Sequence, residues 1–249
     1  MEGNDNRFMT IQEKSGTLSD RQSEILSIVG QSGFATIEGL ADRFGVSAQT
    51  VRRDIIALSN AGRLQRFHGG AGPIEQEEAT RLDYHAKQQI SRPEKQVIGK
   101  KAAALIPDGS VLYLDVGTTV EACAGYLAKR KGFTIFTNSM PSAMKFDPAD
   151  HQIIVMGGEM AGRDGSLVGT EIVETLNSVS LDIALIACSA IDKGGRVMDF
   201  DLEKIAIKKA AINASQTSML LATKSKVGRT ALGVLDHIDR FGHVVSEDS

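Results

Sequence analysis

The sequence predicts an α/β protein with two domains, a small helical one followed by a larger one of alternating strands and helices. Two observations predict this division. In residues 18–74, apolar residues recur at helical spacing and a glycine turn separates two of the helical segments. In residues 96–249, continuous apolar runs alternate with helical segments. A charged stretch, residues 75–95, is expected to be the linker between them. Residues 1–17 are expected to be a disordered N-terminus.

The composition is that of an ordinary globular protein, with 42% hydrophobic and 24% charged residues in a chain of 249. No apolar run is long enough for a transmembrane helix, and the first residues lack the apolar core of a secretory signal. We therefore expect a cytoplasmic protein. Its two cysteines, Cys123 and Cys188, lie far apart among apolar neighbours, which predicts buried free thiols. No metal site and no cofactor are predicted.

Charge is distributed unevenly along the chain. Residues 43–72 carry five arginines and a single acid, Asp54, although the chain as a whole has a net charge of −3. A local excess of positive charge is typical of a surface that meets nucleic acid. The asymmetry therefore indicates that the N-terminal domain binds nucleic acid and the remainder does not.

The N-terminal domain reads as three helices followed by a two-stranded wing. Ser19 and Asp20 can cap the first helix, the second follows Thr36, and Gly45 ends it in a tight turn. Ser47 can cap a third helix, "AQTVRRDIIALSNAG", and "RLQRFHGGAG" then predicts two strands that turn at Gly69-Gly70. Two helices joined by a glycine turn and followed by a wing make a winged helix-turn-helix.

The third helix has the residues that a DNA-reading helix needs. Val51, Ile55 and Leu58 recur on its apolar face, so its polar side chains point outward. The candidate DNA-binding residues are Ser47, Gln49, Thr50, Arg52 and Arg53 on this helix, and Arg66 and His68 on the wing. The alternative is a solvated amphipathic helix on which Arg53 or Asp54 only braces a neighbouring element.

The C-terminal domain alternates apolar strands with helices. After a helix from Val97 to Ile106, the predicted strands are "VLYLD", "FTIFT", "HQIIVMGG", "DIALIACSA", "SMLLA" and "HVVS", with helices from Thr119, near Ser142, from Thr170 and over "LEKIAIKKAAINAS". This order predicts a mostly parallel sheet that helices cover on both faces.

Three polar loops follow strands of this sheet, where such domains bind ligands. They hold Gly117, Thr118 and Thr119 in "LDVGTT", Thr137, Asn138 and Ser139 in "FTNS", and Gly157 and Gly158 in "VMGGE". A glycine turn that opens a helix presents unpaired N–H groups to an anion, although Gly-Thr-Thr also often just caps a helix. Together the loops predict a small-molecule site that accepts a phosphate.

The chain resembles the DeoR family of bacterial transcriptional regulators. The resemblance lies in "VSAQTVRRDI" and "GRLQRFHGGA", and further along in "LDVGTT", "FTNS", "VMGGE" and "DLEKIAIKKAAI". It implies a C-terminal sensor domain similar in fold to ribose-5-phosphate isomerase and glucosamine-6-phosphate deaminase. It also implies binding to double-stranded operator DNA, usually as a repressor of carbohydrate-catabolism genes, and a phosphorylated sugar or related metabolite as effector.

The resemblance also implies roles for individual residues. The phosphate would lie on Gly117, Thr118 and Thr119 with Lys226 as counter-charge, and Asp115, Asn138, Arg163 and Glu203 would surround the sugar. In one loop the chain departs from the family, because Thr223 stands where an aspartate is common and Lys224 follows it. This difference suggests either that the ligand is more anionic than is usual for the family or that the sequence has drifted at a position on the rim of the site without a change of ligand.

Two other kinds of protein remain as alternatives. A sugar-phosphate isomerase or deaminase fused to a DNA-binding domain needs a pair of acid-base groups. Asp192, Asp199, Asp201 and Glu203 are candidates, but "DKGG" is equally a hairpin turn and no histidine has a catalytic motif around it, so no catalytic residue is predicted. The other alternative is a DNA-binding scaffold whose second domain only dimerises. We expect a non-enzymatic regulator that works as a homodimer or homotetramer.

Overall fold

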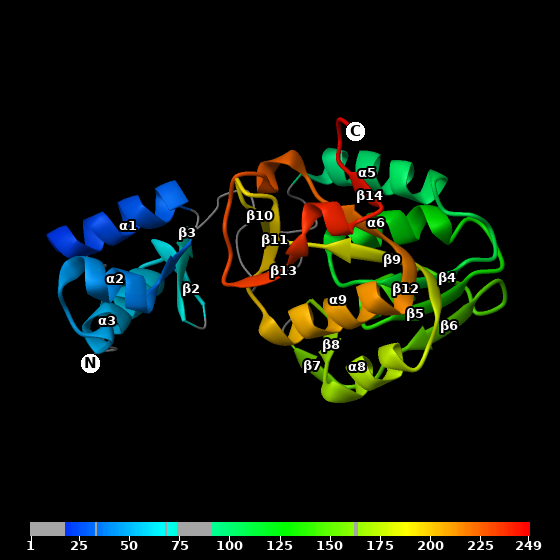
Figure 1. The fold of residues 1–249 in the computed structure, drawn as a ribbon, viewed down its shortest axis with the longest axis horizontal. Coiled ribbons are helices and arrows are strands. Elements are labelled where there is room, and N and C mark those ends of the chain that lie inside the picture. Colours follow the sequence, from blue (N-terminus) through cyan, green and yellow to red (C-terminus); the bar gives the residue numbers. More distant parts are fainter. Residues whose placement is uncertain (1–17, 33, 68, 74–90, 162–163) are drawn as a thin grey trace, which may run out of the picture.

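The computed structural model describes residues 18–32, 34–67, 69–73, 91–161 and 164–249. Figure 1 shows the N-terminal domain in blue and cyan beside a larger domain coloured from green to red. Residues 1–17 and most of the stretch 75–95 lie outside the described residues, and so do the candidate site residues His68 and Arg163.

The N-terminal domain has the predicted winged helix-turn-helix arrangement. Its elements are α1 (Asp20–Ser32), β1 (Ala35–Thr36), α2 (Ile37–Phe44), α3 (Ala48–Asn60), β2 (Leu64–Phe67) and β3 (Gly70–Pro73). Gly45 ends α2 in the left-handed region at φ 62°, a conformation that glycine adopts without steric cost. The side chain of Ser47 then caps α3 by accepting a hydrogen bond from the N–H of Thr50 at 3.2 Å.

The wing strands β2 and β3 pair antiparallel, and β3 also pairs with the short β1, giving a sheet of order β1-β3-β2. Val51, Ile55 and Leu58 of α3 are buried against α1 and α2, as their spacing predicts. One face of α3 is therefore fixed in the core and the opposite face is turned to solvent.

The C-terminal domain is built on a six-stranded sheet of order β14-β12-β9-β4-β5-β6, in which every pair is parallel. Its strands are β4 (Val111–Leu114), β5 (Thr134–Thr137), β6 (Gln152–Val155), β9 (Leu181–Ala187), β12 (Ser215–Leu221) and β14 (His243–Val245). The helices are α5 (Arg92–Ala104), α6 (Thr118–Leu127), α7 (Met140–Ala143), α8 (Thr170–Asn177) and α9 (Leu202–Ala214), with short 3₁₀ turns at Lys224–Lys226 and Ile238–Arg240.

Helices cover both faces of this sheet, as predicted. One apolar core lies between the sheet and α5 and α6, and a second lies between the sheet and α8 and α9; Figure 1 shows the two pairs above and below the strands. Cys123 and Cys188 are buried, and neither forms a disulfide bond. Helix α5 begins at Arg92, five residues before the predicted Val97 and inside the stretch expected to be linker.

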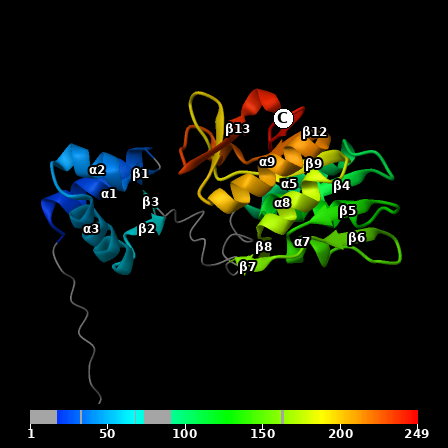
Figure 2. The same cartoon turned by 60° about the horizontal axis from the view of Figure 1, so that its bottom comes forward.

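Two small antiparallel sheets were not predicted. One pairs β7 (Glu159–Ala161) with β8 (Ser166–Val168), and the other has the order β10-β11-β13, from Ala190–Ile191, Arg196–Asp199 and Gly233–His237. The turn between β10 and β11 is the "DKGG" hairpin, in which the Asp192 carboxylate accepts from the N–H groups of Gly194 and Arg196. In Figures 1 and 2 the β10-β11-β13 sheet lies on the side of its domain that faces the wing.

Candidate functional site

The exposed face of α3 and the wing form the candidate nucleic-acid surface. Gln49, Arg52 and Arg53 are exposed on α3, and Arg66 is exposed on β2. The Ser47 hydroxyl caps the helix and lies 3.0 Å from the Thr50 hydroxyl. The side chains on α3 belong to its first two turns, which are the part of a recognition helix that enters the major groove.

A shallow hollow joins the helix to the wing. Arg52 and Arg66 line it together with Ile56, whose side chain is exposed beside the two arginines. Two guanidinium groups beside one hollow suit the phosphates of a DNA backbone.

The brace between α1 and α3 is Asp54, not Arg53. The Asp54 carboxylate is buried and accepts from Arg21 at 2.6 Å and from Gln22 at 3.3 Å, and both donors belong to α1. The structure thus separates two neighbours in the sequence, because Asp54 holds the domain together while Arg53 faces solvent.

A cavity lies at the carboxyl ends of β4, β5 and β9. Of the predicted effector-binding residues, those that line it are Gly117, Thr118, Thr119, Ser139 and Lys226. No side chain caps α6, which begins at Thr118, so its first N–H groups are available to an anion. Gly117 is needed for packing, because a Cβ atom there would lie 2.8 Å from the Cβ of Ala187.

The cavity lining mixes both signs of charge. Its cationic residues are Lys95, Lys204, Lys208, Lys226 and Arg229, and its acidic residues are Glu121, Asp164, Asp199 and Asp201. Lys204 pairs with Asp164 at 2.8 Å, and the Lys226 ammonium donates to the main-chain carbonyl of Cys188. Such a lining can both hold an anionic group and accept hydrogen bonds from hydroxyl groups.

A buried ionic network supports the floor of this cavity. The Lys208 ammonium on α9 lies 3.0 Å from Asp115, 2.7 Å from Asp199 and 2.7 Å from the main-chain oxygen of Ala187. Burial alone would raise the pKa of Asp199, but Lys208 and hydrogen bonds from Ser189 and the Phe200 N–H hold that pKa well below its usual range.

The other carboxylate of the network behaves differently. Burial raises the pKa of Asp115, and the attraction of Lys208 offsets this only in part. Asp115 also accepts from the N–H of Ala187 at 2.9 Å. The resemblance implies that it surrounds the sugar, but its partners Lys208, Ala187 and Tyr113 all belong to the protein, and it does not line the cavity.

Two more predicted residues stabilise loops. The Thr137 hydroxyl donates to the Leu114 carbonyl at 2.7 Å, and the Asn138 amide donates to Leu167 O and accepts from the Tyr113 hydroxyl. Both side chains are buried and neither lines the cavity.

Gly157, Gly158 and Glu203 also do not line the cavity, so their place in the effector site stays a prediction. Gly158 is required by packing instead, since a Cβ atom there would lie 2.2 Å from the Val168 carbonyl oxygen. Glu203 is exposed in the first turn of α9, one residue from Lys204, whose side chain does reach the cavity.

The two residues that depart from the family pattern, Thr223 and Lys224, do not line the cavity, although Lys226 in the same loop does. Thr223 is buried and its hydroxyl lies 2.8 Å from that of Ser225. Lys224 forms an ion pair with Asp248 near the C-terminus and does not line the cavity. Lys224 therefore gives no support to the expectation of a more anionic ligand, which stays a prediction.

Several lining residues were not predicted as part of the site, among them Asp164, Asp199, Lys204 and Lys208. A signal for two of them was present, because Lys204 and Lys208 are four residues apart and so share one face of a helix. Lysines on the otherwise apolar face of a helix are unusual and point to buried partners.

Among the residues that the structure describes, no three His, Cys, Asp or Glu side chains gather as a metal site. Nor is any described helix long and apolar enough to cross a membrane.

A winged helix-turn-helix with an arginine-lined face, joined to an α/β domain with a polar cavity, defines a DNA-binding transcriptional regulator with a sensor domain. Two family models match the chain, "DeoR-like helix-turn-helix domain" over residues 21–77 and "DeoR C terminal sensor domain" over residues 90–248. The chain belongs to the DeoR family.

Curated relatives are named as regulators. The glycerol-3-phosphate regulon repressor of Escherichia coli is 34% identical over 86% of this chain and 84% of its own. Its namesake in Haemophilus influenzae is 32% identical over 92% and 89%. The L-fucose operon activator of Escherichia coli is 28% identical over 92% and 94%. These names support a regulator and not an enzyme.

Solved structures match more distantly. Ribose 5-phosphate isomerase A from Methanocaldococcus jannaschii aligns with a TM-score of 0.41 and 15% identity over 55% of each chain. The eIF2B delta subunit from Chaetomium thermophilum aligns with a TM-score of 0.47 and 17% identity over 63% of this chain and 56% of its own. This chain thus spans little more than half the length of either protein.

Proposed function

We propose that this protein represses a carbohydrate-catabolism operon and releases its operator when a phosphorylated sugar or polyol binds in the C-terminal cavity. The observation that carries the proposal is the cavity at the uncapped start of α6, lined by Thr118, Thr119 and Lys226. Helix N–H groups and a lysine together form a phosphate site.

The mixed charge of the lining supports a ligand that is more than a phosphate ion. Asp164, Asp199 and Asp201 lie on the cavity wall with Lys204. Carboxylates accept hydrogen bonds and cannot donate them when ionised, so they favour a ligand with hydroxyl groups. A phosphorylated polyol or sugar has both features.

Glycerol 3-phosphate is the first compound to test, because two relatives are named for its regulon. We further infer that the protein acts in the cytoplasm as a homodimer or homotetramer. A two-fold symmetric assembly would place two α3 helices on the halves of a palindromic operator.

The decisive experiment measures binding and turnover together. The purified protein is incubated with glycerol 3-phosphate, fructose 1-phosphate, glucose 6-phosphate and ribose 5-phosphate, and both thermal unfolding and product formation are recorded. We expect one compound to raise the melting temperature without being converted. Conversion would indicate an enzyme, and an unchanged melting temperature with every phosphate would indicate a scaffold.

DNA release is the second part of this test. A duplex is obtained by in vitro selection with the purified protein, and its binding is followed by fluorescence anisotropy. The stabilising compound should weaken the binding, because an effector shifts the equilibrium only through different affinities for the two states. A compound that stabilises the protein yet leaves duplex affinity unchanged would contradict effector-controlled repression.

A further inference from the structure

The wing of the DNA-binding domain forms part of the wall of the sensor cavity. Gln65 and Phe67 of β2 and Gly72 of β3 line it together with Thr118 and Lys226. The sensor domain alone therefore does not complete this cavity.

Three phenylalanine side chains join the two domains at this edge of the cavity. The rings of Phe67 on the wing and Phe200 next to α9 are stacked, with centroids 4.0 Å apart and an interplanar angle of 11°. Phe34 packs against both, at 5.8 Å from Phe67 and 5.6 Å from Phe200. Phe200 itself lines the cavity and follows Asp199, the partner of Lys208.

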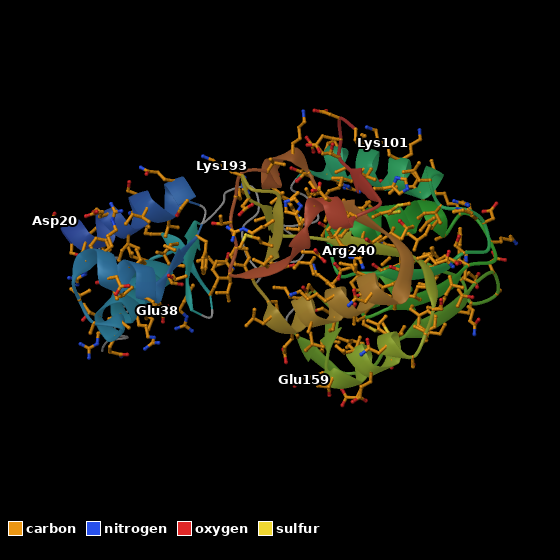
Figure 3. The ribbon with its side chains drawn as sticks, viewed as in Figure 1. Asp20, Glu38, Lys101, Glu159, Lys193 and Arg240 are labelled. Atoms are coloured by element: carbon orange, nitrogen blue, oxygen red, sulfur yellow. The ribbon has the colours of Figure 1, made fainter. Side chains whose placement is uncertain are left out.

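Other contacts hold the wing in the same place. The Thr230 hydroxyl donates to the main-chain carbonyl of Ser32 at 2.8 Å. At the turn of the wing, a Cβ atom on Gly69 would lie 3.6 Å from Leu232. In Figures 1 and 2 the wing strands face the sheet that contains β13, and Figure 3 shows Lys193, in the β10–β11 turn, on the same side of the sensor domain.

Phe67 also belongs to the DNA-binding side of the wing. It lines the hollow that Arg52 and Arg66 share, as well as the sensor cavity. Phe67 thus borders both sites, and Arg66 beside it in the strand is a candidate DNA contact. Consecutive residues of a strand point to opposite faces, which lets Gln65 reach the cavity while Arg66 faces the hollow.

We propose that the effector site is composite, with Gln65 and Phe67 of the wing as ligand-contacting residues, so that a bound effector holds the wing against the sensor domain and away from DNA. This inference rests on the proposed function. The ligand is a phosphorylated polyol or sugar whose phosphate lies at the start of α6. One of its hydroxyl groups meets the Gln65 amide, which can both donate and accept.

The effector must favour this docked arrangement, because only there does it contact both domains. In the proposed arrangement the wing, while its turn lies beside Leu232 of the sensor domain, does not also lie against DNA. Effector binding and DNA binding therefore compete for the wing. The effector must weaken DNA binding by the same factor by which DNA weakens effector binding.

The test compares ligand binding by full-length variants in titration calorimetry. The probe is whichever of glycerol 3-phosphate, fructose 1-phosphate, glucose 6-phosphate and ribose 5-phosphate binds the unmodified protein most tightly. Phe200→Ala and Gln65→Ala should each raise its Kd at least about fivefold, because each removes a wall or a polar contact of the site. Phe200→Leu should restore part of the loss. Leu202→Ala is the matched control, since Leu202 is exposed and does not line the cavity.

The same variants are then tested on the selected duplex. Phe200→Ala should bind it at least as tightly as the unmodified protein when no effector is present. The effector concentration that releases half of the duplex should rise by the same factor as the Kd. A Kd within twofold of the original for both Gln65→Ala and Phe200→Ala would overturn the composite site. No binding of any probe by the unmodified protein would instead contradict the proposed function.

A disulfide trap tests the docked wing without any ligand. Ser32→Cys and Thr230→Cys are combined in one chain, where oxidation should join them within that chain and reduce duplex affinity at least about tenfold until a reductant is added. The native cysteines are buried, so the unmodified protein is the control. Failure to form the bond, a bond between two chains, or unchanged duplex affinity after oxidation would each overturn the inference.

Discussion

Lys208 and Asp199 form a buried ion pair in which the lysine nitrogen lies 2.7 Å from a carboxylate oxygen. Asp115 lies on the other side of the same nitrogen at 3.0 Å. The three residues come from α9, from the end of β11 and from the residue after β4, so a single cation joins three segments that are distant in sequence.

Replacing Lys208 by methionine should therefore destabilise the protein severely. The change keeps most of the length of the side chain but leaves two buried carboxylates without a counter-charge, at a cost of about 3–5 kcal/mol. Urea unfolding measures the loss. Lys209→Met is the control, because the neighbouring lysine is exposed on the same helix and should change stability by less than about 0.5 kcal/mol. Equal stability of the two variants would contradict a structural role for the pair.

Arg53→Ala should weaken binding to the selected duplex at least about tenfold and leave effector binding unchanged. The side chain is exposed on the outward face of α3, where one charge-assisted contact to DNA contributes about 1–3 kcal/mol. Anisotropy titrations at several salt concentrations measure the effect. Arg43→Ala is the control, since Arg43 pairs with Glu24 at 3.4 Å and is not a candidate DNA contact. An equal loss of duplex affinity in both variants would indicate that only the net charge of the domain matters for binding.

Thr118→Ala combined with Thr119→Ala should abolish the response to the effector without weakening duplex binding. Both residues line the cavity at the start of α6, where the hydroxyl groups are next to the free N–H groups of the helix. The measurement is duplex release as a function of effector concentration. Thr175→Ala on α8 serves as control, because its hydroxyl bonds to Glu171 O in its own helix. If the double variant still releases the duplex at the normal effector concentration, the start of α6 is not part of the effector site.

Cys123 should resist alkylation in the folded protein. Burial raises the pKa of its thiol to about 12, so almost none of it is the reactive thiolate at pH 8. Mass spectrometry after treatment with iodoacetamide should find it unmodified in buffer and modified in urea. Rapid modification of Cys123 under native conditions would show that helix α6 opens readily.

The sequence predicted the architecture well because periodic apolar residues determine it. Ser47 was identified as the cap of α3, Gly45 as the end of α2, and the alternation of strands and helices as a parallel sheet. The β10-β11-β13 sheet was missed because β10 has only two residues and β13 joins from far along the chain. Such pairings leave little local signal.

Individual site residues were harder to predict. Thr137 and Asn138 end a strand at the correct edge of the sheet, yet their side chains bond to Leu114, Leu167 and Tyr113. A sequence shows that a polar residue stands at a strand end but not which way its side chain turns. Conversely, Lys208 was overlooked because its partners Asp115 and Asp199 become neighbours only in the folded protein.

The three-phenylalanine contact limits how regulators of this kind can be recombined. A hybrid built by joining a foreign helix-turn-helix to this sensor domain would replace Phe34 and Phe67 while keeping Phe200. The foreign domain could still fold and recognise its own operator, yet it would lack the aromatic surface that Phe200 meets. A metabolite biosensor built in this way should therefore carry phenylalanine in the foreign domain at the positions equivalent to Phe34 and Phe67.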